Sequence, residues 1–130
     1  MALHISIIAP DRTVWDSDAE EVILPSSTGQ LGILRGHAPL LTALDIGVMR
    51  LKSDAGWSSI VVMEGFAEVE DNKVTILCNG AEEGSSIDSA TAQSELERVT
   101  LLVDEATTKK EKIEATLELR KAKARLQAVA

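Results

Sequence analysis

The chain has few aromatic residues, a single cysteine and no long apolar run. Its 130 residues contain two Trp, one Phe and no Tyr, and Cys78 is the one cysteine. A single cysteine excludes a disulfide-stapled scaffold and a Cys-rich zinc site. A membrane-spanning helix needs about 18 consecutive apolar residues, whereas the longest uncharged run, residues 22–34, is shorter and is broken by Pro25, Gly29 and Gly32. We expect a soluble, intracellular protein with a reduced thiol.

Acidic residues outnumber basic ones, and the two signs are unevenly distributed. The chain has 21 Asp or Glu and 13 Lys or Arg, a net charge of −8. Residues 109–130 carry seven cations and three anions, a net of +4, so the first 108 residues have a net of −12. The acidic part disfavours nucleic acid, and the basic tail lacks the aromatic residues on which bases stack. The tail instead favours an acidic protein surface, or is neutralised by its own chain.

Composition changes near residue 85. All eight Gly and all three Pro lie before this point, and Ala, Leu, Glu, Lys and Arg dominate after it. The segment 79–86 (NGAEEGSS) has the glycines and serines of a joint between two parts. We therefore expect an α+β chain with two domains, residues 1–84 and residues 85–130.

The first domain has the pattern of short β-strands. Leu3, Ile5 and Ile7 alternate with polar residues, as in a half-buried strand. The other candidate strands are residues 19–24, which we expect Pro25 to end, and residues 30–34, 48–52, 57–63, 66–70 and 73–77. Seven or more short strands with frequent turns predict an antiparallel sandwich or barrel.

The second domain has two helical stripes of apolar residues. They recur in steps of four and three, at Ala92, Leu96, Val99, Val103 and Ala106 and again at Ala115, Leu119, Ala122, Leu126 and Val129. Such stripes predict two helices that pair along a narrow seam. Asp88 is the predicted N-cap of the first helix, and residues 107–110 (TTKK) are the predicted reversal. We expect an antiparallel two-helix hairpin that is marginal by itself and needs the first domain or a partner.

Catalytic motifs are absent from the sequence. There is no Ser nucleophile elbow, no His-Glu-x-x-His helix and no phosphate-binding loop. His4 falls on the polar side of its strand, where we expect solvent exposure, and Cys78 falls on the apolar side of its own. Carboxylate pairs such as Glu82-Glu83 are interpreted as solvated strand ends. A hydrolase that uses His37 has no nucleophile or orienting acid.

Residues 29–42 (GQLGILRGHAPLLT) form the most unusual segment. Three glycines within eight residues, followed by Pro39, imply special backbone angles, and no lysine or helix start follows as in a phosphate cradle. Two interpretations stay open. One is a turn that His37 closes, and the other is an exposed loop that presents Gln30 and His37 to a protein partner.

Two overlapping segments carry a family resemblance. Residues 7–29 (IIAPDRTVWDSDAEEVILPSSTG) and 29–50 (GQLGILRGHAPLLTALDIGVMR) closely resemble the ε subunit of F-type ATP synthases, and the similarity extends over the whole chain. Residues 11–16 (DRTVWD) are most similar to the plant-plastid and cyanobacterial branch.

The resemblance implies an N-terminal antiparallel β-sandwich of about ten strands and a C-terminal helical hairpin in the central stalk of the synthase. The implied partners are the γ subunit, the ring of c subunits and, transiently, the catalytic β subunits. The subunit would be non-catalytic, would couple proton flow to ATP synthesis, and would inhibit ATP hydrolysis when its hairpin changes conformation. Its implied location is peripheral, on the stromal or cytoplasmic side of a chloroplast or cyanobacterial thylakoid.

The resemblance also implies partner-binding residues. Gln30 and His37 would lie in a loop, residues 30–41, at the bottom of the sandwich near the c-ring and γ. Many relatives have a carboxylate at the position of Gln30, where this chain can offer only a hydrogen bond. The cations that would contact the catalytic subunits are Arg120, Lys121, Lys123 and Arg125. The alternative is that they form a solvated helix face and neutralise Glu114 and Glu118.

Some bacterial relatives bind ATP through the motif Ile/Leu-Asp-x-x-Arg-Ala. The matching residues 87–92 (IDSATA) retain Asp88 and Ala92, but Thr91 replaces the arginine. This degenerate site would comprise Ile87, Asp88, Ala92, Arg98 and Arg125. Because a phosphate-binding cation is missing, we expect no cofactor, with ATP as a weak regulatory ligand at most and Asp88 as a helix cap. A free-standing ATP sensor is the alternative function.

Overall fold

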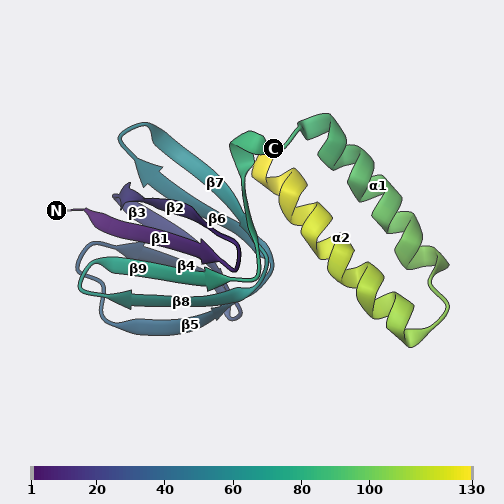
Figure 1. The fold of residues 1–130 in the computed structure, drawn as a ribbon, viewed down its shortest axis with the longest axis horizontal. Coiled ribbons are helices and arrows are strands. Elements are labelled where there is room, and N and C mark those ends of the chain that lie inside the picture. The colour runs from purple at the N-terminus through teal and green to yellow at the C-terminus, as the bar shows by residue number, and fades with distance from the viewer. Residues whose placement is uncertain (1, 130) are drawn as a thin grey trace.

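The computed structural model describes residues 2–129 as a strand-rich domain from which two helices project (Figure 1). The strands are β1 (Leu3–Ala9), β2 (Arg12–Ala19), β3 (Glu21–Ser26), β4 (Gly29–Leu34), β5 (Leu40–Leu44), β6 (Gly47–Ser53), β7 (Gly56–Val62), β8 (Gly65–Glu70), β9 (Lys73–Cys78) and β10 (Ala81–Glu83). A 3₁₀ turn (Gly84–Ser86) leads to α1 (Ser89–Glu105) and α2 (Lys109–Val129).

The ten strands form one continuous sheet that folds over on itself. Its order is β10-β7-β6-β3-β5-β8-β9-β1-β2, with β4 paired to β3 off this path. β3 and β5 share a single residue pair, Ser26 with Leu44. The predicted sandwich of about ten strands is confirmed. The pairing is antiparallel with the exception of β1 and β9, which run parallel.

The core lies between the two halves of the folded sheet. Alternate residues of β1, namely Leu3, Ile5 and Ile7, are fully buried, as their spacing predicts. Each large aliphatic side chain removed from water in this way contributes about 1.5–3 kcal/mol. Cys78 is also buried, and its thiol donates to the carbonyl of Ile8 at 3.6 Å.

Pro25 does not end its strand, contrary to the sequence-based expectation. β3 continues through Pro25 to Ser26. The Pro25 carbonyl accepts a hydrogen bond from the N–H of Asp45, in the connection between β5 and β6, at 2.9 Å. Because N–H and C=O of one strand residue point to the same side, the missing N–H of Pro25 faces this connection instead of a strand ladder.

The sequence did not predict strands β2, β5 and β10, since none of them has a clear apolar alternation.

The helices form the predicted antiparallel hairpin. Asp88 caps α1, because its Oδ2 accepts from the N–H of Thr91 at 2.9 Å and from the Thr91 hydroxyl at 2.8 Å. Thr108 and Glu111 form a capping box at α2: the Glu111 N–H donates to the Thr108 hydroxyl at 3.1 Å, and the Thr108 N–H donates to the Glu111 carboxylate at 3.4 Å. The ten predicted seam residues are all buried or half-buried.

Candidate functional site

The C-terminal part of α2 packs on the sandwich through a small apolar contact, which we call the hairpin seat. Ala124 of α2 is buried there against Val48 of β6, Val61 of β7 and Met63. Ile46, Ile87 and Ala128 lie half-buried around them. The alanines allow the helix backbone to approach the sheet closely, but they bury little area, so the seat contributes less than a layer of leucines would.

One ion pair crosses the same contact. Arg125 of α2 donates from Nη2 to Oε2 of Glu82 on β10 at 2.8 Å and from Nε to both carboxylate oxygens at 3.1 Å. The two side chains are 29% and 34% exposed, so water screens this pair less than a surface pair. The hydrogen bond from Arg125 to Glu82, with the charges of Glu82, Glu118 and Glu95, raises the pKa of Arg125. Glu82 is therefore no solvated strand end, and that expectation was wrong.

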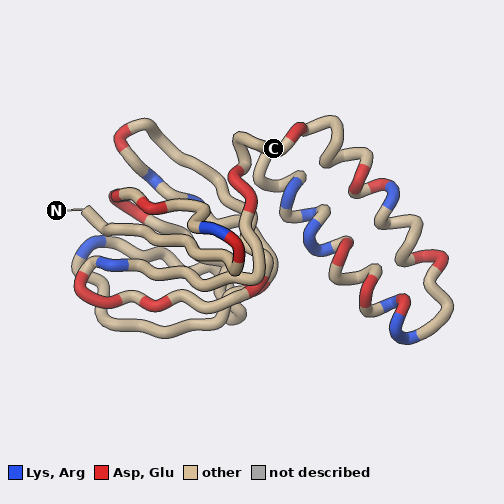
Figure 2. Tube along the Cα trace, viewed as in Figure 1, with Lys and Arg blue, Asp and Glu red and all other residues tan. Residues whose placement is uncertain are grey.

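Neighbouring charges extend this pair into what we call the ion network. Arg98 donates to Glu95 within α1 at 2.8 Å, and Lys121 donates to Glu118 within α2 at 3.5 Å. The hydrogen bond from Arg98 lowers the pKa of Glu95, and the charge of Arg125 adds to that effect. The members of the network are Glu82 on the sandwich, Glu95 and Arg98 on α1, and Glu118, Lys121 and Arg125 on α2. Figure 2 shows that both helices carry acidic and basic residues. Three anions thus face three cations.

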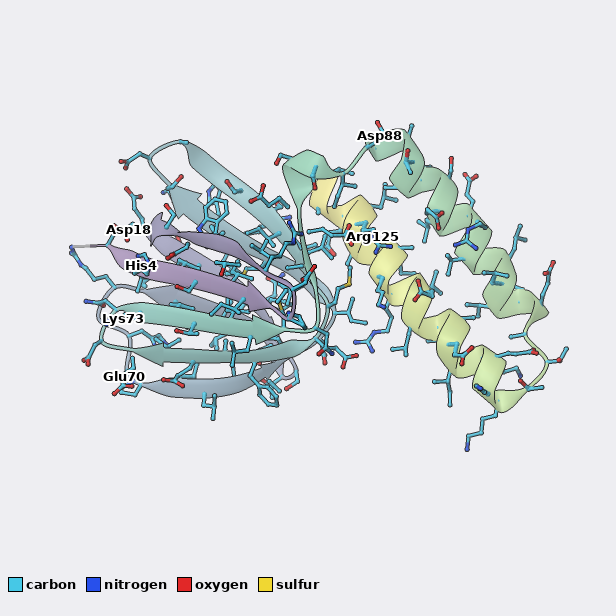
Figure 3. The ribbon with its side chains drawn as sticks, in the orientation of Figure 1. His4, Asp18, Glu70, Lys73, Asp88 and Arg125 are labelled. Carbon is cyan, nitrogen blue, oxygen red and sulfur yellow. The ribbon has the colours of Figure 1, made fainter. Side chains whose placement is uncertain are left out.

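The residues of the predicted ATP site are each engaged in the protein itself. Asp88 caps α1, and the bonds from Thr91 lower its pKa. Ile87 packs against the hairpin seat, and Ala92 is buried in the helical seam. Figure 3 shows Asp88 at the start of α1 and Arg125 on α2. The structure brings Arg98 and Arg125 together around Glu95, but Asp88 lies ten residues before Arg98, about 15 Å along the helix.

The four cations predicted to contact a partner differ in their surroundings. Arg125 is committed to Glu82 and Lys121 to Glu118. Arg120 and Lys123 are exposed and have no hydrogen bond or ion pair within residues 2–129. Beside Arg120, the exposed Ile113 and Leu117 form an apolar patch on the surface of α2. Periodicity alone did not identify this apolar patch, because it lies off the seam stripe.

Gln30 and His37 lie at opposite ends of β4. Gln30 is exposed near the start of the strand, and His37 is half-buried in the connection after its end. Residues 30–34 alone span roughly 13 Å at the rise of a β-strand. Residues 30–41 are therefore not one loop, since 30–34 and 40–41 belong to strands. The N–H of His37 donates to the carbonyl of Leu34 at 3.1 Å, which agrees with a turn that His37 closes.

An exposed apolar row crosses the outer face of the sheet, and the sequence reasoning missed it. Ile8 of β1 neighbours Leu77 of β9, Leu77 neighbours Phe66 of β8, and Phe66 neighbours Ala43 of β5. The exposed fractions are 38% for Ile8, 54% for Leu77 and 58% for Phe66. The row lines a cavity of about 600 Å³ that Asp45 and Glu64 border. Its signal in the sequence is an apolar residue at the outward position of each strand, which becomes visible only once the register is known.

His4 is exposed, as expected, and joins β1 to β2. Its Nε2 is 2.6 Å from Oδ1 of Asp16, and its Nδ1 is 2.8 Å from Oδ1 of Asp18. The hydrogen bond to Asp18, followed by that to Asp16, raises the pKa of His4. Within residues 2–129 no group of three or more His, Cys, Asp or Glu side chains is arranged to hold a metal ion, and neither helix is long and apolar enough to cross a membrane.

Comparison with known proteins agrees with the fold. Residues 2–84 match the family model "ATP synthase, Delta/Epsilon chain, beta-sandwich domain", and residues 85–130 match "ATP synthase, Delta/Epsilon chain, long alpha-helix domain". The chloroplastic ATP synthase epsilon chain of Emiliania huxleyi is 78% identical over 130 residues, with both chains fully covered. The ATP synthase epsilon chain of Synechococcus sp. is 52% identical over 128 residues, covering 98% of this chain and 93% of the relative.

A solved structure of a more distant protein shows the same fold. A chain in the cryo-EM structure of Euglena gracilis mitochondrial ATP synthase (OSCP/F1/c-ring, rotational state 1) superposes with a TM-score of 0.85 at 19% identity, covering 99% of this chain and 82% of that one. From the two family matches and the high identity over full length, the chain belongs to the ATP synthase ε chains, non-catalytic subunits of the central stalk.

Proposed function

We propose that the chain couples proton flow to ATP synthesis by joining γ to the c-ring, and that its hairpin inhibits ATP hydrolysis by leaving the sandwich. The hairpin seat is the single observation that carries the second half of this proposal. α2 meets the sandwich through two alanines and the Arg125–Glu82 pair. A partner that offers comparable burial and a favourable charge can replace contacts of this size.

The cations of α2 are the proposed contact with the acidic surface of the catalytic β subunits. Arg120 and Lys123 are exposed on the docked hairpin and are available for a first encounter. Lys121 and Arg125 would follow after exchanging their intramolecular carboxylates for those of the partner. Ile113 and Leu117 would add apolar area beside them, which charge alone does not supply.

The apolar row is the proposed docking surface for γ. Large exposed apolar patches on a soluble domain mark interaction sites, and this row lies on the rigid sheet, so the hairpin can move without disturbing it. Gln30 and His37 remain proposed contacts at the junction of γ and the c-ring. Because they lie at the two ends of β4, a single partner that touches both must span the strand.

Docking on γ is tested by substitution in the row. We expect Phe66→Asp to abolish co-purification with a γ-type subunit, because a charge would have to be buried in an apolar interface. Leu34→Asp is a matched control, since Leu34 on β4 is equally exposed at 58% but lies outside the row. Equal retention of γ by both variants would remove the row from the proposal.

Inhibition is tested by removing residues 87–130. We expect the shortened chain to assemble into the synthase and the enzyme to hydrolyse ATP faster than with the full chain. Hydrolysis that stays unchanged over the whole range of proton-motive force would exclude an inhibitory hairpin.

A free-standing ATP sensor, the alternative function, requires tight nucleotide binding. We propose that ATP binds weakly or not at all, because Thr91 stands where the motif has arginine and Arg98 and Arg125 are paired with carboxylates. Calorimetry on the full chain distinguishes the two functions, and submicromolar affinity would favour the sensor. Thr91→Arg should strengthen binding.

We also propose a location for the chain. Because its relatives of high identity include chloroplastic ATP synthase epsilon chains, we propose that it lies on the stromal side of the thylakoid as part of the synthase.

A further inference from the structure

Charges from all three packed elements act on Arg125. Glu82 comes from β10, Glu95 from α1 and Glu118 from α2, and each carboxylate raises the pKa of the Arg125 guanidinium. The strongest of these contacts crosses from the hairpin to the sandwich. Undocking of the hairpin must therefore break the bonds to Glu82, whereas Glu118, on the same helix, moves with Arg125.

We infer that Arg125 and Glu82 form a latch that keeps the hairpin docked without a nucleotide, and that a carboxylate-rich protein surface opens it by taking Arg125 from Glu82. This inference rests on the proposed release of the hairpin and adds to it the group that controls release. The partner supplies a carboxylate, because release breaks the charge-assisted hydrogen bonds from Arg125 to Glu82, and a second carboxylate replaces bonds of that kind whereas water or a neutral group replaces them only in part.

The composition of the ion network explains why a nucleotide is not needed. Its three cations are balanced by three carboxylates, so it leaves no uncompensated cation for a phosphate group. A triphosphate would have to displace Glu82 or Glu95, which are held by charge-assisted hydrogen bonds of 2.8 Å. A protein surface that also covers Ile113 and Leu117 can offset the same exchange with apolar burial, and a small anion cannot.

Hydrogen exchange of the full chain tests the latch. Because an undocked hairpin of this length is marginal by itself, the amides of the last two turns of α2 report on docking. We expect Glu82→Gln and Arg125→Gln each to raise their exchange rate about tenfold, and the double variant to exchange no faster than either single one, since all three break one interaction. The amides of β1 and β9 must keep their protection, which shows that the sandwich is folded.

Lys123→Gln is the matched control. It removes one positive charge from the same helix, two residues from Arg125, at a site with no hydrogen bond or ion pair in the part of the chain described here. We expect this variant to exchange within about twofold of the unmodified chain. Millimolar Mg-ATP should leave the exchange of the unmodified chain unchanged.

Three results would overturn the latch: equal exchange in Glu82→Gln and Lys123→Gln, additive effects in the double variant, or strong protection by Mg-ATP. If exchange behaves as expected but removal of residues 87–130 does not change ATP hydrolysis, the latch holds and inhibition is refuted. If exchange does not behave as expected but the removal speeds ATP hydrolysis, the latch is refuted and inhibition holds. The two proposals therefore fail separately.

Discussion

The sandwich and the hairpin both contain regularly spaced apolar residues but bury very different side chains. The sandwich core includes Ile5, Ile7, Leu24 and Ile76, each fully buried. In the hairpin, within the described residues, Val99 and three alanines reach the same class of burial, and the leucines of the seam stay half-buried. Free energy from burial scales with apolar area, so the difference divides the molecule into a stable platform and a part that can detach from it. Within one protein, the free energy of local opening commonly runs from near zero in weakly packed parts to the full free energy of unfolding in the core.

Truncation of a core side chain gives the largest expected effect and sharpens the comparison. Ile5→Ala should lower the free energy of unfolding of the sandwich by about 2–5 kcal/mol, because the sheet cannot collapse around the cavity. Val99→Ala should leave the sandwich transition almost unchanged, since Val99 contributes to the helical seam alone. Denaturant unfolding followed by the fluorescence of the two tryptophans, both in the sandwich, measures the difference. Equal losses in the two variants would show that both parts unfold as one unit.

Loss of the helix cap has an intermediate expected effect, confined to the hairpin. Asp88→Ala removes the acceptor of the Thr91 N–H and hydroxyl, so the first turn of α1 should fray and its amides should exchange several-fold faster. Ser94→Ala, at an exposed position of the same helix, is the control. Sandwich amides that also lost protection would contradict the division into two parts.

The same cap gives the hairpin a pH dependence of known sign. Since its bonds to Thr91 lower the pKa of Asp88 from the ordinary value of 3.8, the contribution is present above that value and is lost as pH falls through the lowered one. We expect protection of the α1 amides to decrease below about pH 4 in the unmodified chain. Asp88→Ala should remove this part of the decrease.

Local patterns were sufficient for the elements of the hairpin and for most strands. The steps of four and three identified every seam residue, and Asp88 was placed correctly as a cap because capping depends on neighbours in sequence. The prediction that Pro25 ends its strand was wrong, because the effect of a proline depends on what faces its missing N–H, which here is the connection at Asp45. β2 escaped because its residues 16–18 (DSD) are polar on both faces. The error at Pro25 thus comes from a contact between residues distant in sequence, and the error at β2 comes from the lack of a local apolar signal.

The site shows the same limit more strongly. Glu82 looked like a solvated carboxylate because its partner, Arg125, lies 43 residues further on. Gln30 and His37 were expected in one loop because they are close in sequence, but the extended strand β4 separates them in space. The apolar row can be recognised only when the register of its four strands is known. Family resemblance supplied the identity of the chain, but none of these three arrangements.

The smallest expected effect concerns His4, whose pair of carboxylates can be compared with the latch. Both are charge pairs between elements, but His4, Asp16 and Asp18 are largely exposed, with side-chain exposures of 47%, 61% and 71%, whereas Arg125 and Glu82 are half-buried. The hydrogen bonds to Asp18 and Asp16 raise the pKa of His4 from 6.5. The imidazolium form therefore stabilises the β1–β2 edge fully below pH 6.5, and this effect is lost as pH rises through the raised pKa.

An NMR titration should place the midpoint of His4 above 6.5, and Asp18→Asn should lower it more than Asp16→Asn. His4→Gln should leave the unfolding midpoint of the sandwich nearly unchanged, because solvent screens exposed pairs. A midpoint that fell as far as in Ile5→Ala would mean that polar contacts on the outer face stabilise the sandwich as much as its core does, and the contrast between platform and hairpin would then no longer rest on buried area.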